Sequence, residues 1–222
     1  MNRRFENIKK SLNAHEIIGL DIPDVNYEKI LLEAAGNMSN DYEILYISIN
    51  KPYELLRSKL EENKININKF QFIDCITRTE NAARSTENCN YVSSPKAIDE
   101  IQMAVRDILN NREIDLTVID SPSSLLTYYE HTDVLKFIHL LMTKLVVSGC
   151  KGIFPFQSES AGTLRRSIEM FVDEIVQVSD EKSESNTNYG SVNLRYLVEN
   201  LIMKFRIRYL QLDLKNKSYN IT

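Results

Sequence analysis

Cysteine and glycine are scarce in this sequence, and the scarcity of each argues against a class of protein. Only three of the 222 residues are cysteine (Cys75, Cys89 and Cys150), and they lie far apart without a C-x-x-C pair. An odd number of dispersed cysteines argues against a disulfide framework and a zinc site, and it favours a reducing cytoplasm. The six glycines form neither G-x-G-x-x-G nor G-x-x-x-x-G-K-[ST]. The usual sequence signs of a nucleotide-binding loop are therefore missing.

Long apolar runs are also missing, so the sequence predicts no membrane-spanning helix. The most apolar stretch, residues 134–150, contains Lys136, His139 and Lys144, which indicates a buried helix instead. The basic start MNRRFENIKKSLN is not followed by an apolar segment and does not predict a secretory signal. We therefore expect a cytoplasmic protein with no membrane partner.

The charge balance gives little support to nucleic-acid binding. The chain has 27 Lys and Arg against 31 Asp and Glu, for a formal net charge of −4. One basic stripe stands out near the C-terminus, where Lys204, Arg206 and Arg208 alternate with apolar residues. Such a stripe is usually the solvated face or guarded edge of a strand. The alternative is a surface that contacts phosphate or nucleic acid.

Short apolar segments alternate with segments of helical spacing along most of the chain. Predicted strands are residues 44–49, 70–75, 116–120, 152–156 and 174–178, and predicted helices are residues 27–38, 52–63, 95–109, 134–147 and 163–171. This alternation predicts an α/β fold with a mainly parallel sheet. We expect one domain over 1–222, with an N-terminal helix at 1–14 and a core at 15–178.

The C-terminal part of the chain has a different pattern. Residues 179–191 are polar, charged and without periodicity, which predicts a mobile loop. Residues 192–200 could form a helix or a strand. The alternation that follows, ending in a turn and a short apolar segment, predicts a C-terminal β-hairpin within 192–222.

Polar side chains follow the ends of four predicted strands. In an open parallel sheet, ligands bind in the crevice beyond the carboxyl ends of the strands. The candidate ligand-binding residues at these ends are Asn50, Lys51, Asp74, Asp120, Ser121, Ser124 and Gln157. Asp, Asn and Ser also cap helices and turns without any ligand, so a structural role is open for each residue taken alone. Their occurrence together at four strand ends favours a binding crevice.

The segment LTVIDS, residues 116–121, resembles a Walker B strand, in which an acid holds magnesium near the phosphates of a nucleotide. With the strands and helices around it, from residue 44 to 178, it resembles the KaiC-like branch of the RecA superfamily. Within that branch it resembles the degenerate archaeal KaiC-like proteins, with a weaker resemblance at residues 20–23. The resemblance implies a RecA-like three-layer sandwich, a role for Asp120 near nucleotide or magnesium, and side-by-side assembly, so that a homo-oligomer stays open beside a monomer.

The departures from this family's pattern concern ATP hydrolysis. Between Pro23 and the strand that begins at Ile44, the sequence has room for a helix but not for a strand, a phosphate loop and a helix. Asn50 or Lys51 stands where the resemblance places the catalytic glutamate, and neither an amide nor an ammonium can accept a proton from water. We therefore expect no catalytic residues and no resident metal, with at most weak binding of nucleotide or magnesium through Asp120.

These observations favour a non-catalytic regulatory or sensory protein. It would bind a small molecule or a partner protein at the carboxyl edge of the sheet. One alternative is an ATP-binding or ATP-hydrolysing protein with a non-standard phosphate site. The other is an accessory protein similar to recombinase paralogues, which would bind nucleic acid through Lys204, Arg206 and Arg208.

Overall fold

The computed structural model describes residues 3–158 and 162–178, all within the compact unit Met1–Glu181. Its strands are β1 (Ile17–Ile22), β2 (Ile44–Ser48), β3 (Phe70–Asp74), β4 (Cys89–Tyr91), β5 (Leu116–Asp120), β6 (Lys151–Gln157) and β7 (Glu174–Gln177). Its α-helices are α1 (Arg3–Ala14), α2 (Tyr27–Met38), α3 (Tyr53–Glu62), α4 (Ile98–Asn111), α5 (His131–Val147) and α6 (Gly162–Ile168). Short 3₁₀ turns lie at Ile67–Lys69, Thr77–Thr79 and Pro122–Thr127.

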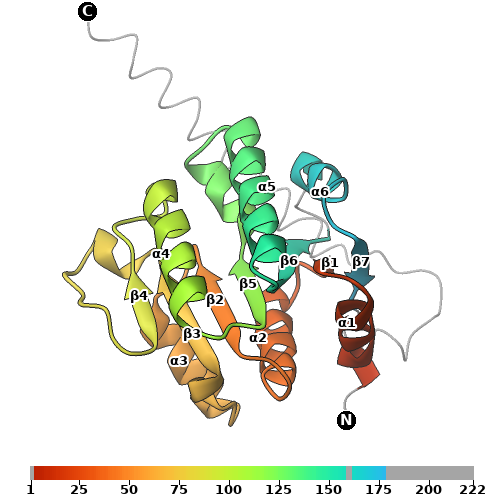
Figure 1. Ribbon diagram of the computed structural model, residues 1–222, viewed down its shortest axis with the longest axis horizontal. Coiled ribbons are helices and arrows are strands. Elements are labelled where there is room, and N and C mark those ends of the chain that lie inside the picture. Colours follow the sequence, from red (N-terminus) through yellow and green to blue (C-terminus); the bar gives the residue numbers. More distant parts are fainter. Residues whose placement is uncertain (1–2, 159–161, 179–222) are drawn as a thin grey trace, which may run out of the picture. The chain divides into compact units, whose positions relative to one another are not determined.

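The strands form one sheet in the order β4-β3-β2-β5-β6-β1-β7 (Figure 1). Every strand pair in the described part of the chain is parallel. The prediction of an α/β fold with a mainly parallel sheet is confirmed. Parallel strands need crossover connections, and the helices between them supply these.

Helices cover both faces of the sheet, which makes three layers. On one face, α1, α2 and α3 pack on alternate strand residues such as Leu20, Tyr46 and Phe72. On the other face, α4, α5 and α6 pack on Ile47 and Phe154 and their neighbours. Because both faces are buried, the central strands are apolar on both sides, as the sequence pattern indicates.

The apolar stretch at 134–150 forms most of α5 and the turn that leads from it into β6. The helix is buried, as predicted, with Val134 and Leu141 among the side chains packed against the sheet. Gly149, with φ +69°, ends the helix in the left-handed conformation that glycine adopts most easily, and the N–H of Cys150 donates to the carbonyl of Leu145. Among the described residues, no helix combines the length and apolarity that crossing a bilayer requires.

Two strands of the sheet are absent from the sequence prediction. β1 carries Gly19 and Asp21, which interrupt its apolar pattern, yet all six of its residues are buried between β6 and β7. β4 has three residues and lies at the sheet edge beside β3. The helix predicted between Pro23 and Ile44 is present as α2, but the strand that precedes it, β1, was not predicted. A strand, a turn and a helix follow one another between Ile17 and Met38.

Several predictions lie outside the described residues. These are the mobile loop at 179–191, the helix or strand and hairpin within 192–222, and the basic stripe of Lys204, Arg206 and Arg208. The division of the chain as one domain also stays a prediction.

Candidate functional site

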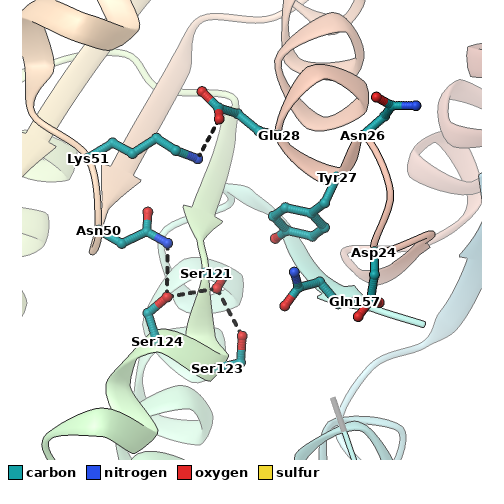
Figure 2. A pocket seen from close by; sticks show the side chains of 10 residues that line it. All are labelled: Asp24, Asn26, Tyr27, Glu28, Asn50, Lys51, Ser121, Ser123, Ser124 and Gln157. Carbon is teal, nitrogen blue, oxygen red and sulfur yellow. Dashed lines mark hydrogen bonds and ion pairs between the residues drawn. The ribbon is translucent and has the colours of Figure 1, made fainter. Parts of the chain in front are cut away.

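The carboxyl ends of β2 and β5 meet at the middle of the sheet, where Ser48 is in register with Asp120. The chain leaves β2 toward α3 on one face and leaves β5 toward α5 on the other. Such a switch point opens a crevice in doubly wound sheets. A pocket of about 600 Å³ lies here. It is lined by Asp24, Asn26, Tyr27, Glu28, Asn50, Lys51, Ser121, Ser123, Ser124 and Gln157 (Figure 2).

Five of the seven predicted ligand-binding residues line this pocket, namely Asn50, Lys51, Ser121, Ser124 and Gln157. They come from three different strand ends, those of β2, β5 and β6. The structure therefore brings together side chains that are up to 107 positions apart (157 − 50). The two other predicted residues do not line it: Asp120 is buried beneath the pocket, and Asp74 is buried at the end of β3.

One wall of the pocket is a chain of hydrogen-bonded hydroxyl and amide groups. The side-chain nitrogen of Asn50 donates to Oγ of Ser124 at 3.0 Å. Oγ of Ser121 lies 3.1 Å from Oγ of Ser124 and 2.9 Å from Oγ of Ser123 (Figure 2). Because a hydroxyl can both donate and accept, this wall can either donate a hydrogen bond to a bound molecule or accept one from it.

Asp120 lies beneath the pocket, with 1% of its surface exposed. Its Oδ2 accepts a 2.9 Å hydrogen bond from the hydroxyl of Tyr46 and lies 3.7 Å from Nζ of Lys51. Its Oδ1 is buried and has no hydrogen-bond partner among the described residues. Burial raises the pKa of Asp120, and the Lys51 ammonium and the Tyr46 hydroxyl offset only part of that rise.

Lys51 lies between two carboxylates that come from different elements. Its Nζ is 3.7 Å from Asp120 on β5 and 3.5 Å from Oε2 of Glu28 on α2. The turn that carries Lys51 is fixed by Ser48, whose hydroxyl accepts from the Lys51 N–H at 3.2 Å and donates to the Lys51 carbonyl at 2.7 Å. Glu28 also pairs with Lys59. Burial raises the pKa of Glu28, but these two lysines more than offset it, so that its pKa lies below the usual value.

Tyr27, the first residue of α2, fills part of the pocket with its ring (Figure 2). Its hydroxyl is buried and has no hydrogen bond of good geometry among the described residues, although it is directed toward Ser121. Burial, followed by the charge of Asp120, raises the pKa of Tyr27 well above its usual value, and Ser121 offsets a small part. The Tyr27 hydroxyl is thus a second buried polar group without a partner, after Oδ1 of Asp120.

The turn between β1 and α2 forms the remaining rim of the pocket. It has four residues, Pro23, Asp24, Val25 and Asn26, and Asn26 is left-handed with φ 67°. The four lining residues at positions 24, 26, 27 and 28 come from this turn and the first turn of α2. These four residues were not predicted as site residues because β1 was not predicted as a strand. Recognition of residues 17–22 as a strand would have pointed to them as the residues beyond its carboxyl end.

Asp74 does not line the pocket. Its carboxylate instead accepts hydrogen bonds from backbone N–H groups of neighbouring turns. It is fully buried at the end of β3. It accepts hydrogen bonds from the N–H groups of Tyr53, Ile76 and Thr77, at 2.7, 2.7 and 2.9 Å, and from the hydroxyl of Thr77 at 2.5 Å. These bonds tie the start of α3 and the turn after β3 to the sheet.

A comparison with protein-family models matches the chain to "ATPase: KaiC" over residues 33–222. The chain belongs to this KaiC family. Its fold is the RecA-like sandwich that the sequence resemblance implies, and Asp120 ends a central strand as a Walker B acid does. The match begins inside α2, so that β1 and the four-residue turn precede it. No curated protein matches the chain.

Proposed function

We propose that this KaiC family protein does not hydrolyse ATP and instead binds a small polar molecule in the pocket between β1, β2 and β5, with a regulatory or sensory role. The observation that carries the proposal is the four-residue turn between β1 and α2. In a phosphate-loop protein, this connection holds the eight-residue motif G-x-x-x-x-G-K-[ST], whose backbone N–H groups and lysine surround the phosphates.

The residues of the turn do not fit a triphosphate. Pro23 has no N–H group to donate, and the turn contains no lysine. Two carboxylates, Asp24 and Glu28, line the pocket beside it. Their negative charge opposes the binding of phosphate oxygens, although Lys51 and Lys59 compensate part of the charge of Glu28. The ring of Tyr27 takes up room at the start of α2, where phosphate binds in phosphate-loop proteins.

The residues that follow β2 supply no general base. Asn50 is hydrogen-bonded to Ser124, and Lys51 is paired with Glu28 and Asp120. Neither side chain takes a proton from water at neutral pH while it keeps these contacts. The loss of a base and the loss of the phosphate loop are separate changes, at the ends of two different strands, and both support the absence of hydrolysis.

The pocket itself suits a molecule of about nucleoside size. Its volume of about 600 Å³ lies within the range of ligand sites, about 300–1,000 Å³. The Ser121–Ser124 hydroxyls and the Asn50 amide offer donors and acceptors without net charge. We therefore expect a compact ligand with hydroxyl or amide groups and at most one phosphate.

Calorimetric titration with adenosine, AMP, cyclic AMP and magnesium-ATP tests the proposal. We expect saturable binding of at least one of the first three, and none of magnesium-ATP. The double variant Asn50→Ala/Ser124→Ala should weaken that binding by at least about tenfold, because each lost hydrogen bond costs about 1 kcal/mol. The matched control is Thr143→Ala, on the exposed side of α5, which should bind as the wild type does.

Two outcomes would contradict the proposal. Saturable binding of magnesium-ATP that is lost in Asp120→Ala would favour a nucleotide site of a non-standard kind. No binding of any of the four probes would remove the support for a small-molecule ligand of this class, and it would favour a partner protein at the same edge of the sheet.

A further inference from the structure

The carboxylates of Glu28 and Asp120 share one cation, the Lys51 ammonium. Nζ of Lys51 lies 3.5 Å from Oε2 of Glu28 and 3.7 Å from Oδ2 of Asp120. Its side chain is 18% exposed, whereas that of Asp120 is 1% exposed. Lys51 therefore reaches from the pocket wall down to a carboxylate that solvent does not reach.

A buried carboxylate needs a compensating cation, because an unpaired charge in the interior costs several kcal/mol. Tyr46 supplies one hydrogen bond to Asp120, and Oδ1 of Asp120 has no partner among the described residues. The buried hydroxyl of Tyr27 has none either. The Asp120 carboxylate thus has one oxygen without a partner beside its ion pair with Lys51, and the resemblance to a Walker B strand implies a magnesium ion near this acid.

Magnesium in proteins is held by one or two carboxylates, with water completing its coordination. Glu28 and Asp120 are such a pair, and each is within 3.7 Å of the same nitrogen. In the part of the chain that the structure describes, no group of three or more His, Cys, Asp or Glu side chains could hold a metal. A dication at this place would meet the positive charge of Lys51 at short range and be repelled.

We propose that Lys51 is a built-in cation that takes the place of the divalent metal between Glu28 and Asp120, and that it keeps metal out of the site. This inference rests on the proposed non-hydrolytic function and explains why Asp120 persists without a phosphate loop. Its carboxylate holds Lys51 and Tyr46 in position at the pocket. Removal of Lys51 exposes a latent site for a divalent cation with oxygen ligands.

Titration with Mn²⁺, followed by the loss of the free-ion EPR signal, tests this inference in the absence of nucleotide. Wild type should show no site that depends on Asp120. Lys51→Ala should bind one Mn²⁺ at least about tenfold more tightly than wild type, because a repelling charge beside two carboxylates is gone. The double variant Lys51→Ala/Asp120→Asn should lose this gain.

The matched control is Lys59→Ala, since Lys59 pairs with Glu28 but has no contact with Asp120 among those observed. It should bind Mn²⁺ as wild type does. If Lys51→Ala does not fold, as judged by circular dichroism, Lys51→Gln replaces the ammonium by an uncharged amide of similar reach. The same gain is expected there, together with a Mn²⁺-dependent rise in Tm that Asp120→Asn removes.

The inference is overturned if a folded Lys51 variant gains no Mn²⁺ site, if the gain survives Asp120→Asn, or if Lys59→Ala gains as much. These outcomes leave the proposed function intact as long as wild type still fails to bind magnesium-ATP. Binding of magnesium-ATP by wild type would instead contradict the proposed function, and the two failures are therefore distinguishable.

Discussion

The hydroxyl of Tyr46 donates a 2.9 Å hydrogen bond to Oδ2 of Asp120 beneath the pocket. The two residues lie on neighbouring strands, β2 and β5, and both are almost completely buried. The hydroxyl of Tyr27, also near Asp120, has no such bond among the described residues. The two tyrosines near this carboxylate thus differ in their hydrogen bond to it, and mutation can measure that difference.

Tyr46→Phe should lower the free energy of unfolding by about 1–3 kcal/mol, because it leaves a buried carboxylate without its hydrogen-bond donor. Tyr27→Phe removes a buried hydroxyl that has no hydrogen bond of good geometry among the described residues, and it should leave the free energy of unfolding unchanged or raise it by up to about 1 kcal/mol. Urea unfolding of both variants and wild type makes the comparison. Equal losses in the two variants would contradict the hydrogen-bond assignment.

The raised pKa of Asp120 predicts a pH dependence of stability. The folded state keeps the proton on Asp120 to a higher pH than the unfolded state does, since the ordinary pKa is 3.8. The contribution of Asp120 to stability therefore falls as the pH rises from about 4 through its folded-state pKa.

Asp120→Asn cannot titrate, so the stability of wild type relative to this variant should decline as the pH rises from about 4 to 7. Urea unfolding over this pH range measures the difference. Asp107→Asn, an exposed carboxylate on α4, is the control. A difference that grows with pH would indicate that the pKa of Asp120 is lowered in the folded protein.

Asp74→Ala should destabilise the protein by about 3 kcal/mol, because three backbone N–H groups and the hydroxyl of Thr77 lose one acceptor. Asp74→Asn keeps an acceptor oxygen and should cost less. Asp107→Ala serves again as the exposed control, with an expected change within about 0.5 kcal/mol. If Asp74→Ala were as stable as the control, the structural role of these hydrogen bonds would be wrong, and a ligand-binding role of Asp74 would be favoured instead.

All three thiols should be unreactive in the native protein. Burial raises the pKa of Cys150 to about 11 and that of Cys89 to about 12, and burial raises the pKa of Cys75 well above its usual value. The thiolate is the reactive form, so little of it is present at pH 8. A thiol-specific chromogenic disulfide should label none of the three before unfolding and all three in denaturant. Rapid labelling of a native thiol would contradict this burial.

Local sequence patterns predict the central strands of the sheet but not every strand. Strands β2, β3 and β5 were predicted to within one residue, because short, mostly apolar segments mark strands buried on both faces. β1 was missed because Asp21 lies within it. That carboxylate is compensated by the guanidinium of Arg165 at 2.9 Å and by Ser158, both more than 130 positions away, which a local pattern cannot reveal.

The candidate site was predictable where it depends on topology, because the carboxyl ends of parallel strands meet at one edge. The residues after β2, β5 and β6 therefore lie around one pocket. The orientation of single side chains was not predictable. Asp74 turns toward the backbone of its own loop, and Lys51 turns toward Asp120 on the next strand, and both choices follow from tertiary contacts.

Steady-state hydrolysis of ATP with magnesium, in wild type and Asp120→Ala purified in parallel, tests most directly whether this KaiC family member has lost its ATPase activity. Phosphate release should be the same in the two proteins and equal to the background without protein. A turnover that persists through further purification of wild type and disappears in Asp120→Ala would show that the pocket hydrolyses ATP despite its four-residue turn.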